Sequence, residues 1–248
     1  KIIKVKPDSL AETIGIQSGD RLLKINGKRV IDEIDYKFRM TEESLLLELE
    51  INGKVERVEV DKEYDDHLGV EFEEMKIRGC ANDCVFCFVD QNPPNMRDSM
   101  YFRDGDYRMS YLHGHYITMT NMGQNELKRI VEQRLSPLYI SVHVTDSKLR
   151  QKLFLYKKDD SLLEKLKFLT ENGIELHTQI VLMPNINDKK YLLGTLSDIY
   201  PFYPVLKTCT IVPVGLTKHR QGLMDIPIVS KQYAKQMLEK LKVCLVMV

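Results

Sequence analysis

Apolar and polar positions change their pattern about a third of the way along the chain. Up to about residue 72, short β-type runs alternate with turn residues, and the runs 45–51 and 55–60 flank the pair Asn52-Gly53. An Asn-Gly pair between apolar runs predicts a β-hairpin, because both residues tolerate the positive φ values of a tight turn. Asn26-Gly27 is a second such pair. The first part therefore predicts a small β-rich domain with one or two short helices.

After residue 72, apolar runs of strand length alternate with amphipathic helical patterns. This alternation predicts a parallel sheet with right-handed crossovers, in which functional residues lie at the carboxyl ends of the strands. The expected strands are 74–78, 116–121, 138–144, 174–183, 208–214 and a run that begins at Val243. The expected helices are 124–134, 161–172, 190–200 and 230–242.

Composition and charge narrow the class of protein. The chain has 248 residues, of which 43% are hydrophobic and 29% are charged, as in an ordinary globular protein. Its 36 basic residues balance its 36 acidic residues, so the net charge does not indicate a nucleic-acid partner. No apolar run approaches the roughly 20 residues that cross a bilayer, and we expect no membrane association. Five cysteines, three of them within eight positions, make a poor disulfide framework, so we expect a reducing, cytoplasmic setting.

The clustered cysteines are Cys80, Cys84 and Cys87, with the spacing C-x3-C-x2-C. Thiolates bind iron–sulfur clusters and zinc, and three ligands this close can surround one cubane on a short loop. A tetrahedral zinc site needs a fourth ligand, and Cys209 and Cys244 are single and distant in sequence. A 4Fe–4S cluster on three cysteines would keep one iron open for a small molecule. The spacing therefore favours an iron–sulfur cluster, with structural zinc as the alternative.

This cysteine pattern, with Phe86 directly before the third cysteine and an expected strand in front, resembles the signature of the radical S-adenosylmethionine (radical SAM) superfamily. The resemblance covers about residues 74–248 and implies a partial (β/α)6 barrel. It also implies that the open iron binds S-adenosylmethionine, and that an external electron donor reduces the cluster. Reductive cleavage then gives a 5′-deoxyadenosyl radical, while the protein binds, orients and excludes water.

The same resemblance implies three further residues of a cofactor-binding site. Phe86 would lie near the adenine. Members of the superfamily usually carry Gly-Gly-Glu at the end of the second strand, where it contacts the amino group of the methionine part. This chain has Thr120-Asn121-Met122-Gly123 there, and we expect Asn121 to make that contact instead. We expect Gln179, within the fourth expected strand, to contact the ribose of S-adenosylmethionine. No catalytic residue is assigned from the sequence.

Two other features of the second part have open interpretations. His143, in the third expected strand, would either face the mouth of the barrel or be a hydrogen-bonded core histidine, and we favour the first without assigning a role. The stretch 89–114 is too long for an ordinary connection. It is either a lid or substrate loop, or a surface loop held by charge pairs.

The first 72 residues contain Gly15-Ile16-Gln17-Ser18-Gly19-Asp20 and Ile25-Asn26-Gly27-Lys28-Arg29-Val30, which resemble circularly permuted bacterial PDZ domains. Such modules capture a peptide by adding a strand to a sheet edge, with backbone amides receiving the terminal carboxylate. Leu68-Gly69-Val70 is the candidate turn for that carboxylate. The other interpretation is a PDZ-shaped spacer without a ligand.

Taken whole, the chain resembles a bacterial family that combines a PDZ-like domain, a radical SAM core and a C-terminal domain of unknown function. We therefore expect a PDZ-like domain at 1–72 and a radical SAM partial barrel at 73–248, shortened at its C-terminal end. The expected function is hydrogen abstraction from an unidentified substrate, such as a protein or peptide whose C-terminus the PDZ-like domain recruits. The alternative is a non-catalytic iron–sulfur or zinc-binding scaffold with the same recruiting module.

Overall fold

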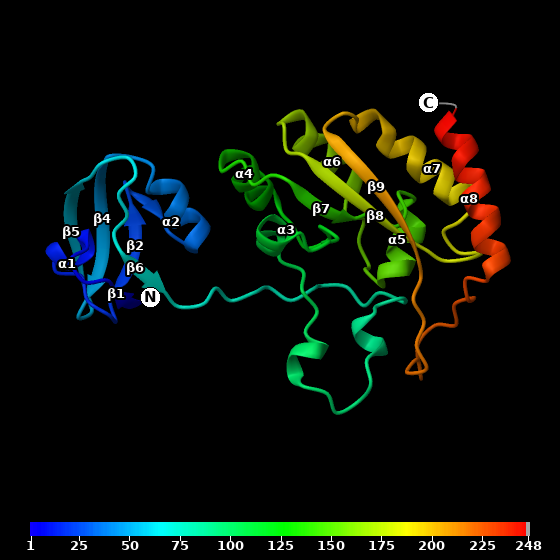
Figure 1. Ribbon diagram of the computed structural model, residues 1–248, viewed down its shortest axis with the longest axis horizontal. Helices are drawn as coiled ribbons and strands as arrows, with labels where there is room; N and C mark the ends of the chain where they lie inside the picture. Colours follow the sequence, from blue (N-terminus) through cyan, green and yellow to red (C-terminus); the bar gives the residue numbers. More distant parts are fainter. Residues whose placement is uncertain (247–248) are drawn as a thin grey trace. The chain divides into compact units, whose positions relative to one another are not determined.

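The computed structural model describes residues 1–246, and the chain divides into two compact units after Lys76. Within the described residues, no helix has both the length and the apolar character needed to cross a membrane. Each unit has its own helices and strands, as Figure 1 shows, and each has its own cluster of buried hydrophobic residues.

The first unit is built on short antiparallel strands. Strands β1 (Ile2–Val5) and β6 (Val70–Phe72) pair with each other, and a second sheet has the order β3-β2-β4-β5. Its strands are β2 (Arg21–Ile25), β3 (Lys28–Arg29), β4 (Ser44–Ile51) and β5 (Lys54–Asp61). Two short helices, α1 (Leu10–Thr13) and α2 (Glu33–Arg39), complete the unit. The prediction of a β-rich domain with one or two helices is confirmed.

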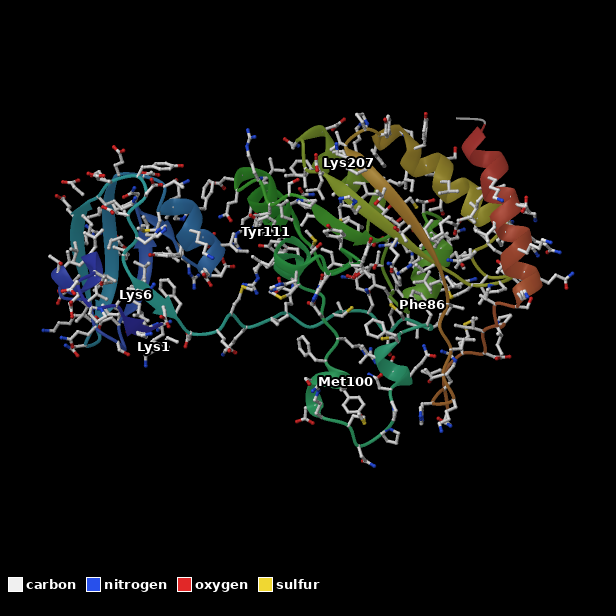
Figure 2. All side chains as sticks on the ribbon, viewed as in Figure 1. Lys1, Lys6, Phe86, Met100, Tyr111 and Lys207 are labelled. Carbon is white, nitrogen blue, oxygen red and sulfur yellow. The ribbon has the colours of Figure 1, made fainter. Side chains whose placement is uncertain are left out.

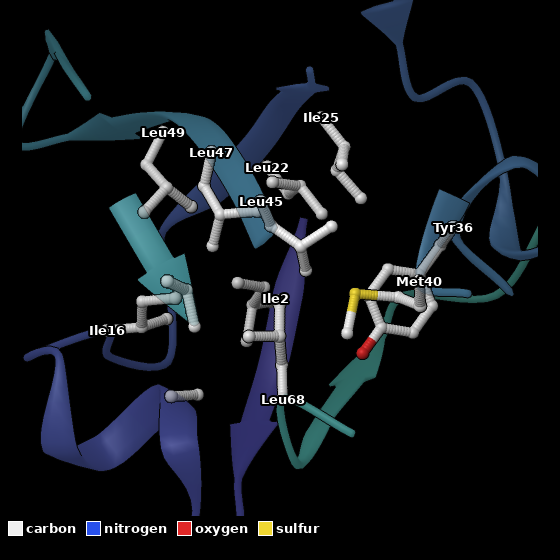
Figure 3. Packing of buried hydrophobic residues seen from close by; sticks show 12 residues of the cluster. Ile2, Ile16, Leu22, Ile25, Tyr36, Met40, Leu45, Leu47, Leu49 and Leu68 are labelled. Atoms are coloured by element: carbon white, nitrogen blue, oxygen red, sulfur yellow. The ribbon is translucent and has the colours of Figure 1, made fainter. Parts of the chain in front are cut away.

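Both Asn-Gly pairs form the turns that the sequence predicts. Asn52 and Gly53 have φ values of 50° and 77°, and they join β4 to β5 in an unbroken antiparallel register from Ser44–Asp61 to Ile51–Lys54. This register places Leu45, Leu47 and Leu49 on one face of the sheet, where each is at most 1% exposed. Figure 3 shows these leucines with Ile2, Ile25 and Tyr36 in the core of the unit.

The second unit is built on a parallel three-stranded sheet in the order β7-β8-β9. The strands are β7 (Leu138–Ser141), β8 (Leu176–Leu182) and β9 (Leu206–Pro213). The helices are α3 (Tyr107–His113), α4 (Gln124–Glu132), α5 (Ser147–Phe154), α6 (Leu162–Glu171), α7 (Lys190–Ile199) and α8 (Lys231–Val246), with short 3₁₀ turns at Val89–Gln91, Asp98–Tyr101 and Tyr200–Phe202. The predicted strand–helix alternation is confirmed over this region.

Three expected strands are wrong. Residues 74–78 form no strand, and an isolated bridge joins Gly79 to Asp104 instead. Residues 116–121 make one parallel bridge, Ile117 to Ile140, because Met119 takes a left-handed backbone with φ 59° that ends extended pairing. The run that begins at Val243 continues α8 to Val246, and its last two residues lie outside the described part.

The described residues of the second unit therefore form an open sheet of three strands, and a six-stranded partial barrel is not confirmed. The two faces of this sheet differ. In β8, Leu176, Thr178, Ile180 and Leu182 are buried, and the three residues between them are half-buried. Because side chains alternate along a strand, those three residues, which include Gln179, share the opposite face.

Candidate functional site

A cavity of about 790 Å³ lies in the second unit, along one face of the parallel sheet. Its lining includes His143, two residues after the end of β7, together with Gln179 and Val181 of β8 and Val214, directly after β9. The cavity therefore sits toward the carboxyl ends of parallel strands, where such folds carry their functional residues.

The three clustered cysteines line this cavity from one loop. Cys80, Cys84 and Cys87 are half-buried free thiols. Burial raises the pKa of the Cys84 thiol, and the neighbouring Cys80 and Cys87 raise it further. The three thiols therefore lie close enough in this cavity that ionisation of one thiol disfavours ionisation of Cys84. In the described chain, no three His, Cys, Asp or Glu side chains are already placed as a group that could hold a metal ion.

Arg103 holds the cysteine loop in place. Its guanidinium donates to Asp83 Oδ1 at 2.6 Å and to Asp90 Oδ1 at 2.5 Å, on both sides of Cys84 and Cys87. Its backbone carbonyl accepts from the Cys80 N–H at 2.7 Å. Charge-assisted hydrogen bonds of this kind are about twice as strong as neutral ones. The stretch 89–114 is therefore attached to the cysteine loop by one of its own charged residues.

The segment after β9 covers the other side of the loop. Gln91 is 1% exposed, and its Nε2 donates to the Cys87 carbonyl at 3.2 Å while its own carbonyl accepts from the Thr217 hydroxyl at 2.8 Å. Val85, beside Cys84, packs in a buried cluster with residues that include Val214 and Ile226. The loop is thus enclosed by chain more than 100 residues away in sequence.

His143 is buried against β8 with 4% of its surface exposed, and it lines the cavity. Its ring packs edge-on against Phe86 and Phe154, with centroid distances of 4.7 and 5.6 Å. Its Nδ1 accepts a hydrogen bond from the Val181 backbone N–H at 3.0 Å. Burial, assisted by the charge of Arg150, lowers the pKa of the imidazole to about 3. The residue therefore faces the cavity and is also a hydrogen-bonded core histidine, so each of the two interpretations from the sequence describes part of its position.

Arg150 of α5 connects the parts of the chain that surround the cavity. Its guanidinium pairs with Asp160 at 2.8 Å, and both side chains are at most 5% exposed. It also donates to the carbonyl oxygens of Val142, directly after β7, and of Thr118, at 2.8 Å for Thr118. Burial lowers the pKa of this guanidinium, and the Asp160 carboxylate opposes that effect. The sequence pattern did not single out Arg150.

The structure brings together most of the residues selected from the sequence. Phe86 and Gln179 line the cavity with the three cysteines, and Figure 2 shows Phe86 in this unit. Asn121 is not among the lining residues, so its role as an amine contact stays a prediction. Asn82 was missed: it lines the cavity, is 4% exposed, and donates to Thr118 Oγ1 at 2.7 Å. Its buried Oδ1 has no hydrogen-bond partner among the described residues.

In the first unit, the turn Leu68-Gly69-Val70 leads directly into β6. Gly69 has φ 78°, and a Cβ there would lie 2.4 Å from the Cβ of Ser9. Tyr36 of α2 packs edge-on against Phe72 of β6, with ring centroids 4.9 Å apart. Burial raises the pKa of Tyr36 to about 12, and a backbone hydrogen bond from Leu68 to the Tyr36 hydroxyl opposes that effect. Within residues 1–246, β6 pairs only with β1, so its other edge is open.

Comparison with protein families gave two matches. The profile of the radical SAM-like domain family matches residues 62–209, which is more than half of the chain. A PDZ domain profile matches residues 1–53. A search of curated proteins found no match.

Solved structures gave weaker similarities. One is methylornithine synthase (PylB), with 14% identity and a TM-score of 0.42 over 64% of this chain. Another is a radical SAM methyltransferase from Sphaerobacter thermophilus, with 15% identity and a TM-score of 0.37 over 94% of this chain. The chain spans 58% of the first structure and 77% of the second.

Proposed function

The chain belongs to the radical SAM-like domain family, and from that premise we propose that it binds a 4Fe–4S cluster on Cys80, Cys84 and Cys87 and cleaves S-adenosylmethionine. The observation that carries this proposal is the position of three free thiols of one eight-residue loop on a single cavity. Three thiolates suit a cubane cluster with one open iron. The cluster would supply the electron that splits S-adenosylmethionine into methionine and a 5′-deoxyadenosyl radical.

The residues around the cysteines suit this cluster in two ways. The cavity volume of about 790 Å³ lies in the range of small-molecule and cofactor sites. The unpaired Oδ1 of Asn82, buried between Cys80 and Cys84 in sequence, needs a donor from a bound group. An ammonium group on a ligand beside the loop would satisfy it.

The chain itself binds, orients and excludes water. Arg103 and Gln91 fix the backbone of the cysteine loop from two directions, which would keep the loop against the cavity when a cluster binds. Phe86 and Gln179 line the same cavity, where Phe86 would offer an apolar surface to the adenine and Gln179 would contact the ribose. The buried cluster of Val85, Val214 and Ile226 closes one side of the site against solvent.

The substrate of the radical is a protein or peptide in this proposal, recruited by the PDZ-like domain. The edge of β6 that no described strand pairs with supports this role, because strand addition needs an unpaired edge. A non-catalytic scaffold that holds zinc or an iron–sulfur cluster is the second candidate. It is less well supported, because Cys209 lies on β9 and does not line the cavity.

The test uses protein reconstituted with iron and sulfide without oxygen, then reduced in the presence of S-adenosylmethionine. We expect bound iron and sulfide near four each per chain, and 5′-deoxyadenosine detected by mass spectrometry. Cys84→Ala should abolish both, while Cys209→Ala, a thiol on β9, should leave both unchanged. A colourless protein that retains zinc instead would overturn the proposal, and so would cluster formation in Cys84→Ala equal to wild type.

A further inference from the structure

The backbone of His143 is strained at the point where β7 ends. Its φ of 57° lies in the left-handed region, which costs a non-glycine residue free energy and persists only where neighbouring groups enforce it. Asn187, which is fully buried, supplies that enforcement by donating from Nδ2 to the His143 carbonyl at 2.9 Å. The same amide accepts from the Met183 N–H at 2.8 Å. This conformation keeps the imidazole between Phe86 and Phe154.

The hydrogen bond from Val181 fixes the tautomer of the ring. A backbone N–H can only donate, so the Nδ1 atom that it meets at 3.0 Å must carry a lone pair. The proton of the neutral imidazole is then on Nε2. Since the pKa of His143 is about 3, the ring is neutral at physiological pH and does not take up a second proton. His143 is therefore a permanent N–H donor and not a general base.

The Nε2–H group is open to the cavity. Among the described residues no acceptor lies within hydrogen-bonding distance of Nε2. Over all described residues of both units, the buried side-chain nitrogen and oxygen atoms without a partner are Arg39 Nε, Arg78 Nη2, Asn82 Oδ1 and Arg220 Nη1. His143 Nε2 is not one of them although the residue is only 4% exposed, and the residue lines the cavity. A bound ligand can therefore reach this donor.

The charge of the surroundings indicates what kind of acceptor this donor meets. Within the described lining, the charged side chains Arg103 and Asp104 already have partners, namely two aspartates for Arg103 and His115 for Asp104. His143 itself contacts Phe86, the residue next to Cys87. A neutral donor beside an aromatic side chain can hydrogen-bond a nucleoside while the apolar face of the base packs on that side chain.

We propose that the Nε2–H of His143 donates a hydrogen bond to the nucleoside part of S-adenosylmethionine, at a ring nitrogen or a ribose oxygen. This inference rests on the proposed function. It makes His143 a positioning residue for the cofactor, held by Val181 on one side and free to bind on the other.

His143→Asn is the variant that separates binding from folding. An asparagine side chain places its Oδ1 where the histidine has Nδ1, so it still accepts from Val181, and asparagine tolerates φ 57°. It lacks a group at the position of Nε2. The experiment measures S-adenosylmethionine binding by equilibrium dialysis to the full chain, loaded with cluster and kept unreduced. We expect binding about tenfold weaker than in wild type, the loss of one hydrogen bond, with unchanged iron and sulfide.

Methionine serves as the second ligand in the same experiment, because it lacks the nucleoside. Its binding to the cluster-loaded protein should be equal in wild type and His143→Asn. Wild-type affinity for S-adenosylmethionine in the variant would overturn the inference, and so would equal losses for both ligands. If wild-type protein holds no cluster, the proposed function fails and the inference falls with it.

Nitrogen NMR of the unaltered, cluster-free protein tests the same inference without a mutation. With ¹⁵N-labelled histidine, the His143 resonances should show a protonated Nε2 and an unprotonated Nδ1 from pH 5.5 to 8. A proton on Nδ1, or a titration of this ring near its ordinary pKa of about 6.5, would contradict the fixed donor.

Discussion

Gly105 lies directly against Cys80: a methyl group at position 105 would sit 2.6 Å from the Cys80 Cα atom and 3.0 Å from its backbone nitrogen. The backbone atoms of Cys80 cannot swing away as a flexible side chain can, because the Cys80 N–H is bonded to Arg103 and Gly79 is bridged to Asp104. The first cysteine of the loop therefore depends on a glycine 25 positions later in the sequence.

Gly105→Ala should displace Cys80 and reduce cluster loading. Forcing a methyl group into a packed site costs about 1–3 kcal/mol, and here the strain falls on a ligand. Iron and sulfide content after reconstitution measures the effect. Gly194→Ala is the matched control, since it lies in α7 with no atom within 4 Å of the added Cβ, and it should load like wild type. Equal loading of both variants would show that the close contact is unimportant.

Arg103→Gln should shorten the time for which the protein retains its cluster. The substitution removes both charged contacts, to Asp83 and Asp90, that hold the loop around Cys84 and Cys87. Cluster loss to an iron chelator, followed by absorbance, should be severalfold faster than in wild type. Arg21→Gln, which breaks an exposed pair with Glu50 in the other unit, is the control and should change nothing. A retention time equal to that of the control would contradict the role of Arg103.

Arg150→Met should destabilise the second unit by about 3–5 kcal/mol, because it leaves the buried Asp160 carboxylate without its partner. Urea unfolding of the full chain measures the change. The control Lys167→Met removes an exposed pair with Glu171 on α6 and should cost no more than about 0.5 kcal/mol. A loss below about 1 kcal/mol for Arg150→Met would mean that the carboxylate finds another partner.

The stability of the cluster-free protein should fall as the pH decreases from 6.5 to 5. The pKa of His143 is about 3 in the folded chain and about 6.5 when unfolded, so below pH 6.5 the unfolded state binds a proton that the folded state does not. The free energy of unfolding then decreases by about 1.4 kcal/mol per pH unit, or about 2 kcal/mol at pH 5. Urea unfolding at several pH values measures this slope. His143→Asn should flatten it, and an identical slope in that variant would refute the assignment.

Tyr36→Phe should strengthen the binding of peptides that end in a free carboxylate. In the folded first unit the Tyr36 hydroxyl is hydrogen-bonded by the backbone of Leu68, in the turn that would receive the carboxylate. Removing the hydroxyl frees that amide and keeps the ring packing against Phe72. Fluorescence anisotropy with a labelled peptide should show severalfold tighter binding by the variant. A peptide with an amidated C-terminus should show no such gain in affinity. Weaker binding by the variant would mean that Tyr36 contacts the peptide itself.

The features that the sequence made predictable are local. Asn52-Gly53 needs only its own backbone preferences to form a turn, and the C-x3-C-x2-C spacing places three thiols on one loop wherever that loop lies. The points where extended pairing ends have the opposite character. Pairing at 116–121 ends where Met119 adopts a positive φ, and His143 does the same just after β7, because the surrounding structure imposes these conformations. The pattern of apolar and polar residues around such positions does not predict a positive φ.

The missed site residues are likewise defined by distant contacts. Arg150 is one of several basic residues in α5, and only its position against Asp160 and the strand ends distinguishes it. Asn82 is a small polar residue inside the cysteine loop, and its importance depends on the burial of one oxygen atom. The cysteine site could be predicted because it depends on sequence spacing. The roles of Arg150 and Asn82 could not, because they depend on burial.

The enclosure of the cysteine loop also bears on how the protein is made. Gln91 and Thr217 are separated by 126 residues, and Val85 and Arg220 by 135. At about 5–20 residues per second, a ribosome needs about 6–27 s to pass from the first member of such a pair to the second. The nascent loop cannot be covered during that interval, so its thiols stay accessible for insertion of the cluster that we propose. The site can therefore close only after the later residues have been synthesised, and the rate of translation sets the time during which the proposed cluster can be inserted into an open loop.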